Sequence, residues 1–203
     1  FSEMLRVLMK QEFQTEGSLF PQERRLKSAL RELLQENVFA NFELRIEKAR
    51  SQKRLMLGGA KDALPFMVWS AGQREFVPLL LGFYWLMPPT KVARRDDFKW
   101  VVIEEPEMGL HPRAISVVLL LILELLKRDY KVCVSTHSPQ VLELVWALKR
   151  ISQEGGATAN VLNLFNVRNR QRIELRSVAE QALKKKIKVF YFERESGDVH
   201  DIS

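Results

Sequence analysis

The apolar residues of the first forty positions recur at helical spacing. Leucines from Leu26 to Leu34 fall on one face of a helix, with charged residues between them. Pro21 suits the first position of that helix, which is predicted to run to about Asn37. A shorter amphipathic helix is predicted over Met4–Phe13. These segments predict a helical start to the chain.

From Phe42 the period changes to two. Apolar residues alternate with charged ones up to Ile46, which is typical of a half-buried strand. Leu55 and Leu57 are the predicted return strand, and the two glycines that follow make the next turn. The pattern predicts a β-hairpin.

An apolar run, Trp100–Ile103, ends abruptly in two carboxylates, Glu104 and Glu105. Four apolar residues bounded by charge predict a strand buried on both faces of a parallel sheet. Ligands of such sheets bind at the carboxyl ends of the strands, where these acids emerge. Side chains of adjacent residues on a strand point in opposite directions, so the two acids cannot share one task. This geometry suits an ATPase in which one acid acts on magnesium and the other on water.

Two elements follow the acids and bring a histidine to the same edge. Pro112, after His111, is predicted to open a helix through the apolar residues up to Leu126. The segment Lys131–Ser135 is predicted to be a second buried strand, which puts His137 at its carboxyl end beside the acids. A histidine at this position is a candidate for contact with phosphate.

The last fifty residues carry weaker patterns. Asn160–Phe165 and Arg172–Leu175 are predicted to form a hairpin of two strands. Ser177–Glu180 has the spacing of a capping box and predicts the start of a short helix. Lys186–Phe192 is predicted to be a final strand.

Another capping box, earlier in the chain, is more informative about function. Ser70 precedes a long apolar run and Gln73 follows three residues later, which predicts the start of a helix that ends at Pro88. A helix start presents free N–H groups, and Gly72 would let a phosphate approach the backbone closely. A capped helix by itself is more often structural than functional.

Composition narrows the class of protein. The chain has 203 residues, a hydrophobic fraction of 46% and a net charge of +7, which indicates a globular protein with some preference for acidic partners. The basic residues are scattered, so solvated faces explain most of them. The single cysteine, Cys133, excludes an internal disulfide. The apolar runs are too short for a membrane span and no secretory signal heads the chain, so we expect a cytoplasmic protein without membrane contact.

In this order, the motifs resemble the second half of an ATP-binding-cassette (ABC) ATPase head. The similarity is to the soluble class found in RecF, SMC-type proteins, OLD-family nucleases and bacterial anti-phage ATPases. The segment Ile103–Pro112 looks like the Walker B motif and D-loop of that class. Ser70–Gln73 looks like the signature motif, and Ser135–Ser138 like the switch-histidine loop. The resemblance covers about residues 40 to 192.

The resemblance implies ATP and Mg²⁺ as cofactors, a P-loop NTPase-like parallel sheet flanked by helices, and a homodimer that sandwiches ATP. Glu104 would hold the magnesium shell, Glu105 would be the general base, and His137 would contact the γ-phosphate. The nucleotide-binding set would also include Ser70, Gly72, Gln73 and His111, with the D-loop crossing the dimer interface. Glu104 stands where the family most often has Asp, and Ala71 where the transporter form has Gly.

The P-loop pattern G-x-x-x-x-G-K-[ST] does not occur in the sequence. We therefore expect the Walker A lobe to lie N-terminal to this chain's first residue and to be a partner of it. The expected organisation is a helical segment over 1–40, a hairpin and signature helix over 41–98, and the ATPase core lobe over 99–203. The fragment alone is not expected to hydrolyse ATP.

Three functions stay open from the sequence. The first is ATP hydrolysis coupled to DNA or to a nuclease or toxin effector, in phage defence or DNA repair. The second is a vestigial head that serves as a structural or DNA-binding dimerisation module. The third and weakest is a metal-dependent nuclease with Glu107 among its ligands, since Pro106 and the following turn fit no metal geometry.

Overall fold

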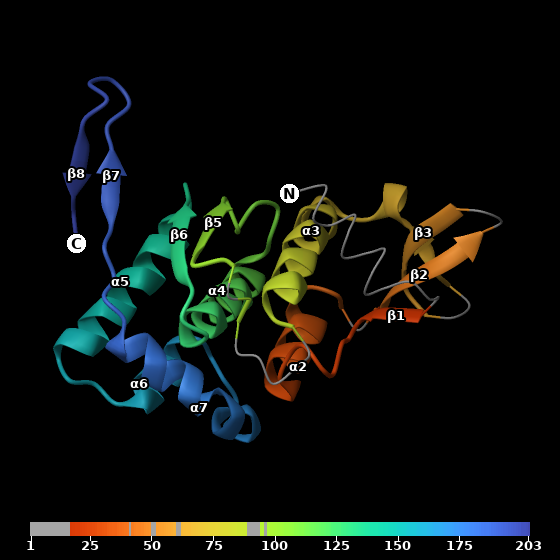
Figure 1. The fold of residues 1–203 in the computed structure, drawn as a ribbon, viewed down its shortest axis with the longest axis horizontal. Coiled ribbons are helices and arrows are strands. Elements are labelled where there is room, and N and C mark those ends of the chain that lie inside the picture. Colours follow the sequence, from red (N-terminus) through yellow and green to blue (C-terminus); the bar gives the residue numbers. More distant parts are fainter. Residues whose placement is uncertain (1–16, 41, 50–51, 60–61, 89–93, 96) are drawn as a thin grey trace.

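The structure is a computed structural model that describes residues 17–40, 42–49, 52–59, 62–88, 94–95 and 97–203. The described residues form a mixed α/β fold with three small sheets (Figure 1). The helix predicted over Met4–Phe13 lies outside them. In chain order the elements are β1 (Gly17–Phe20), α2 (Ser28–Asn37), β2 (Leu44–Ala49), β3 (Gln52–Leu57), β4 (Leu64–Pro65), η1 (Phe66–Val68), α3 (Ala71–Leu86), β5 (Trp100–Glu104), α4 (Pro112–Lys127), β6 (Lys131–Ser135), α5 (Pro139–Gln153), α6 (Thr158–Leu164), α7 (Asn169–Lys184), β7 (Phe190–Phe192) and β8 (Val199–Asp201).

Strands β1 to β4 form an antiparallel sheet at one end of the molecule (Figure 1). In the β2–β3 pair, Leu44 lies opposite Leu57 and Ile46 lies opposite Leu55, so the predicted hairpin is confirmed. Leu44 and Ile46 are buried whereas Glu47 is exposed, which is the alternation of a strand with one covered face.

Helix α2 begins later than predicted. Pro21 does not open it; the amide of Leu26 bonds to Gln22 O at 3.3 Å in a turn, and the helix starts at Ser28. The predicted end at Asn37 is confirmed. The apolar spacing marked the buried helix face but could not separate the turn that precedes it.

Helix α4 is the centre of the core. It packs against α2, α7 and α5, and its apolar block is buried almost all round. One charged residue is buried with it: Glu124, 3% exposed, pairs with Lys27 at 3.4 Å and with Arg128 at 3.2 Å. A buried carboxylate needs such partners because desolvation of an unpaired charge is costly. No helix among the described residues combines the length and the apolar character that crossing a membrane would require.

Strands β5 and β6 pair in parallel, and within the described residues they are the only parallel pair. The prediction that β5 is buried on both faces is wrong. Ile103 is buried, but Trp100 is 63% and Val102 is 68% exposed. In β6 the residues level with these two, Lys131 and Cys133, are exposed as well. Within the described part of the chain, one face of this sheet is thus covered and the other is open. The predicted parallel sheet flanked by helices is therefore seen only in part.

The C-terminal quarter is helical where strands were predicted. Helix α6 occupies the predicted strand Asn160–Phe165, and α7 replaces its predicted partner at Arg172–Leu175. Ser177–Glu180, predicted to start a helix, lies inside α7. The final strand was predicted over Lys186–Phe192, and its last three residues form β7, which pairs with β8 in a hairpin that projects from the body (Figure 1).

Candidate functional site

The carboxyl ends of β5 and β6 carry the predicted catalytic residues. The parallel register sets Glu104 level with Ser135, and the amide of Glu105 donates to Ser135 O at 2.9 Å. His137 follows two residues after β6 ends. The pairing of the two strands therefore brings both acids and the histidine to one edge, as the order of the motifs predicted.

Glu105 and His137 face each other across this edge. Glu105 Oε1 lies 3.4 Å from His137 Nε2, and the two side chains are 37% and 91% exposed. The backbone of Glu105 has a φ of +44°, in the left-handed region, which costs a residue with a Cβ about 1–3 kcal/mol. Glu104 ends β5 as an exposed residue. A solvent-accessible carboxylate beside an imidazole can accept a proton from a water molecule.

Glu107 is a residue of this site whose part the sequence did not reveal. Its Oε1 accepts hydrogen bonds from Thr136 Oγ1 at 2.5 Å and from the amide of His137 at 3.1 Å. The amide of Ser138 donates to Thr136 Oγ1 at 3.0 Å. One carboxylate therefore ties the turn after β5 to the loop after β6. The sequence offered Glu107 only as a metal ligand, because a contact between two loops leaves no local pattern.

The capping box at the start of α3 is confirmed. The amide of Gln73 donates to Ser70 Oγ at 3.2 Å, and Gln73 Oε1 accepts from the amide of Ser70 at 3.0 Å. Ser70 is exposed and Gln73 is half-buried. The box fixes the direction of the helix start, whose remaining N–H groups suit an anion. The helix ends at Leu86, ahead of Pro88 as predicted.

Gly72, next to this cap, packs against the turn that follows β5. It is buried, and a methyl group built on it would overlap the carbonyl group of Gly109. Gly109 itself has a φ of +67°. The backbone of Gly72 is thus approached closely by the backbone of Gly109. This contact alone is sufficient to explain why a glycine occupies position 72. The contact also joins the start of α3 to the turn that carries Glu107.

His111 caps helix α4. Its Nδ1 accepts from the amide of Arg113 at 3.4 Å, and Pro112 occupies the first helical position as predicted. Gln140 Nε2 donates to Pro112 O at 2.8 Å, which joins the start of α4 to the start of α5. The imidazole of His111 is exposed at the same end of the fold as the turn after β5. Its predicted role toward nucleotide stays a prediction, as do those of the other named site residues.

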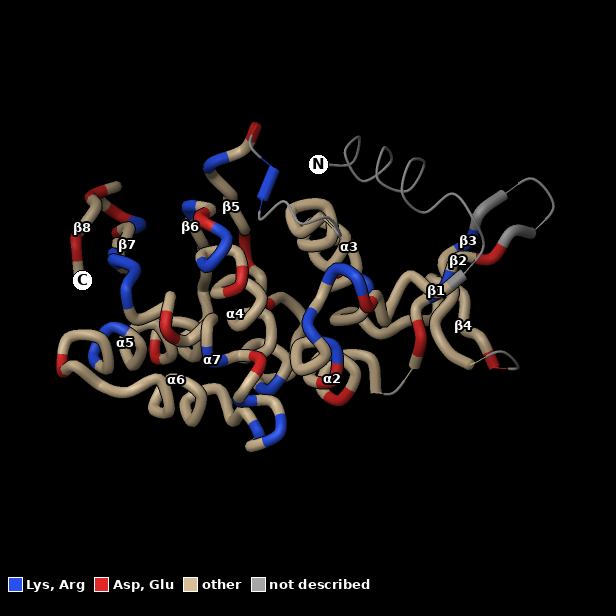
Figure 2. Tube along the Cα trace, turned by 60° about the horizontal axis from the view of Figure 1, so that its bottom comes forward, with Lys and Arg blue, Asp and Glu red and all other residues tan. Residues whose placement is uncertain are grey.

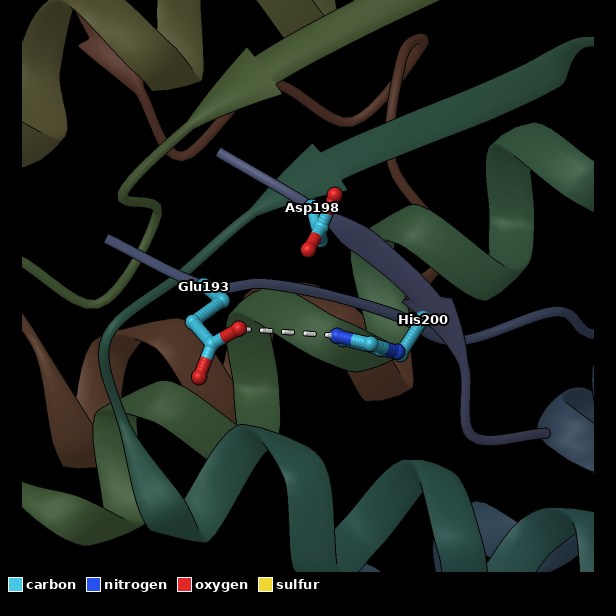
Figure 3. A group of neighbouring side chains, drawn as sticks. All are labelled: Glu193, Asp198 and His200. Carbon is cyan, nitrogen blue, oxygen red and sulfur yellow. Dashed lines mark ion pairs between the residues drawn. The ribbon is translucent and has the colours of Figure 1, made fainter. Parts of the chain in front are cut away.

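A separate group of possible metal ligands lies on the β7–β8 hairpin. Glu193, Asp198 and His200 each offer a ligand atom within 4.8 Å of the others, and Figure 3 shows the three side chains on one side of the hairpin. All three are exposed, and His200 Nε2 lies 3.8 Å from Glu193 Oε2. No sequence pattern singles out these three residues. This is an exposed ion-pair arrangement on another sheet, away from the paired ends of β5 and β6 in sequence and topology.

The basic residues lie on several elements (Figure 2). Those at the start of α7 are engaged with α2: Arg168 pairs with Glu36 at 2.9 Å and Arg170 with Glu32 at 3.2 Å. Both arginine side chains are more than half exposed, at 62% and 64%, so the prediction of solvated faces fits these two residues. They give no direct support to a nucleic-acid interface.

Comparison with known proteins found one related family. The model of the family described as "AAA domain, putative AbiEii toxin, Type IV TA system" matches residues 8–143. The matched stretch includes α3, the paired ends of β5 and β6, and the first turn of α5. Searches of curated proteins and of solved structures found no match.

Proposed function

Because the chain belongs to this family of AAA domains, we propose that it is the catalytic lobe of an ATPase, with its hydrolytic residues at the carboxyl ends of β5 and β6. The observation that carries the proposal is the approach of Glu105 Oε1 to His137 Nε2 at 3.4 Å, across two adjacent parallel strands. The order of the motifs along the chain supports the soluble ABC class within this family.

In the proposed reaction Glu105 accepts a proton from the attacking water. The water oxygen bonds to the γ-phosphorus, the bond from that phosphorus to the β–γ bridging oxygen breaks, and ADP and inorganic phosphate leave. His137, beside Glu105, would donate a hydrogen bond to a γ-phosphate oxygen as charge develops. The exposure of both side chains leaves them accessible to a nucleotide.

The donor set at this edge suits magnesium. The carboxylate of Glu104 and the hydroxyl group of Ser135, which lie level with each other, are hard oxygen ligands, which Mg²⁺ prefers. Glu104, at the exposed end of β5, is the residue proposed to hold the ion through its water shell. When bound, the ion would neutralise charge on the phosphates.

The phosphate-binding loop would come from a Walker A lobe that covers the open face of β5 and β6. Trp100 and Val102 on that face are more than half exposed, and apolar strand faces are normally covered by another layer. Cys133, the only cysteine of the chain, lies on the same face, so the reactivity of its thiol shows whether this face is covered. In the complete native protein its thiol should resist a reagent such as Ellman's until the protein is unfolded. Fast reaction of the native protein would contradict this part of the proposal.

The output is proposed to be defence against phage through a toxin or nuclease effector. The description of the family, which names a type IV toxin–antitoxin system, supports defence over DNA repair. The dimer is proposed to form around ATP, with the start of α3 from one copy against nucleotide held by the other.

The test is ATP turnover and oligomeric state of the complete protein, compared with its Glu105→Gln variant. Loss of the general base should lower kcat at least about 100-fold and leave an ATP-dependent dimer that persists. Glu143→Gln is the matched control, because Glu143 is an exposed glutamate on α5 outside the site. Hydrolysis by the Glu105→Gln variant at the parental rate would contradict the proposal. No hydrolysis by a folded parental protein, with or without DNA, would favour a vestigial head.

A further inference from the structure

Glu107 holds three consecutive residues of the loop between β6 and α5. Its Oε1 accepts from the Thr136 hydroxyl group and from the amide of His137, and the same hydroxyl oxygen accepts from the amide of Ser138. Hydrogen bonds to an ionised acceptor are stronger than neutral ones. The backbone on both sides of the His137 Cα is therefore tied to one carboxylate.

Among the described residues, the imidazole of His137 has few contacts that could orient it. The side chain is 91% exposed, so packing does not fix its rotamer, and its recorded polar contact is with Glu105. Its position relative to Glu105 therefore depends on where the loop backbone lies. That backbone is held through the His137 amide, 3.1 Å from Glu107 Oε1.

The partial burial of the Glu107 carboxylate has a cost in free energy. Oε1 has two donors, whereas Oε2 is buried without a hydrogen-bond partner among the described residues. A charged group in this setting loses hydration that only part of its bonding replaces. Glutamine would accept the same two hydrogen bonds without the charge, so the charge is expected to matter for the strength with which the loop is held.

We propose that Glu107 is a positioning residue, which couples the turn after β5 to the histidine loop and so sets the distance between Glu105 and His137. The inference rests on the proposed ATPase function. Since Glu105 and Glu107 belong to one turn, with the amide of Met108 donating to Glu105 O at 3.0 Å, a shift of this turn moves the base and the loop together.

The experiment compares Glu107→Ala, Glu107→Gln, Thr136→Val and Thr136→Ser in the complete protein, with Glu143→Gln as the control. Loss of a group that orients a reacting residue typically costs 10–100-fold in activity. Glu107→Ala should lower kcat about 10–100-fold and leave KM for MgATP within about twofold. Thr136→Val should show a smaller loss of kcat, Thr136→Ser should restore it, and Glu107→Gln should fall between Ala and the parental protein.

Amide hydrogen exchange provides a readout that is independent of turnover. Exchange at His137 should be at least about tenfold faster in Glu107→Ala and unchanged in Glu143→Gln, because an amide that loses its acceptor opens more often. Parental kcat in Glu107→Ala, in a protein that Glu105→Gln inactivates, would overturn this inference and leave the proposed function standing. Unchanged exchange at His137 would overturn it too. A parental protein that does not hydrolyse ATP would instead overturn the proposed function, and this inference with it.

Discussion

Helix α4 and strand β5 are both strongly apolar in sequence, but they differ in burial. Leu121, in the middle of α4, has no exposed surface, whereas Trp100 and Val102 of β5 are 63% and 68% exposed. Among the described residues, α2, α7 and α5 enclose the helix, while β5 has a layer on one face only. Apolar sequence thus indicates which residues favour burial, and the neighbouring layers decide which of them achieve it.

The largest effect should come from the enclosed side of this comparison. Leu121→Ala deletes fully buried methyl groups from α4 and should lower the free energy of unfolding by about 2–5 kcal/mol. In the 203-residue chain without the proposed Walker A lobe, the matched change on the open side, Val102→Ala, should cost no more than about 0.5 kcal/mol. Urea denaturation followed by circular dichroism measures both. Equal losses would mean that the open face of β5 is covered in solution.

A second pair of substitutions compares a closed backbone contact with an open turn. Gly72→Ala places a methyl group against the carbonyl group of Gly109 and should cost about 1–3 kcal/mol, since backbone must shift. Gly59→Ala is the control, because a Cβ there would meet no atom within 4 Å, and it should cost at most about 0.5 kcal/mol. The same denaturation experiment applies. A Gly72→Ala variant as stable as the parental protein would disprove the tight contact.

The smallest effect concerns pH and the projecting hairpin. Hydrogen bonds from Ser203, aided by Lys188, lower the pKa of Asp201 from 3.8 to about 2. Because the folded pKa is the lower one, the carboxylate stabilises the hairpin above about pH 4 and the effect fades as pH falls toward 2. Carboxyl-carbon NMR should give a titration midpoint near 2, and Asp201→Asn should remove the acid dependence of the hairpin. A midpoint near 3.8 would contradict the contact.

Much of the fold followed from periodicity, and the errors have physical causes. The hairpin of β2 and β3 was predicted because its charged and apolar residues alternate over several positions. Helix α6 was taken for a strand because its apolar run is short, and a short run fits either element. Within Arg172–Leu175, predicted to be the partner strand, Ile173 is 85% exposed. The buried positions of α7 recur at helical spacing: Leu175, Val178, Ala179 and Ala182.

The part of the site that depends on the order of the strands could be predicted from the sequence. Parallel pairing of β5 with β6 brings Glu105 to His137, and the positions of these two residues just after the strands were enough to predict it. Two features were not accessible. The use of Glu107 as an acceptor and the packing of Gly72 on Gly109 are contacts between loops distant in sequence, and such contacts depend on the assembled structure.

The left-handed backbone at Glu105 also bears on how this sequence can drift. Glycine adopts a φ of +44° without steric cost, so Glu105→Gly would relax the chain while it removed the proposed base. Mutation toward higher stability and selection for the proposed hydrolysis would therefore act in opposite directions at this position. In a lineage without the proposed hydrolysis, glycine at position 105 would be the replacement that relieves this strained backbone.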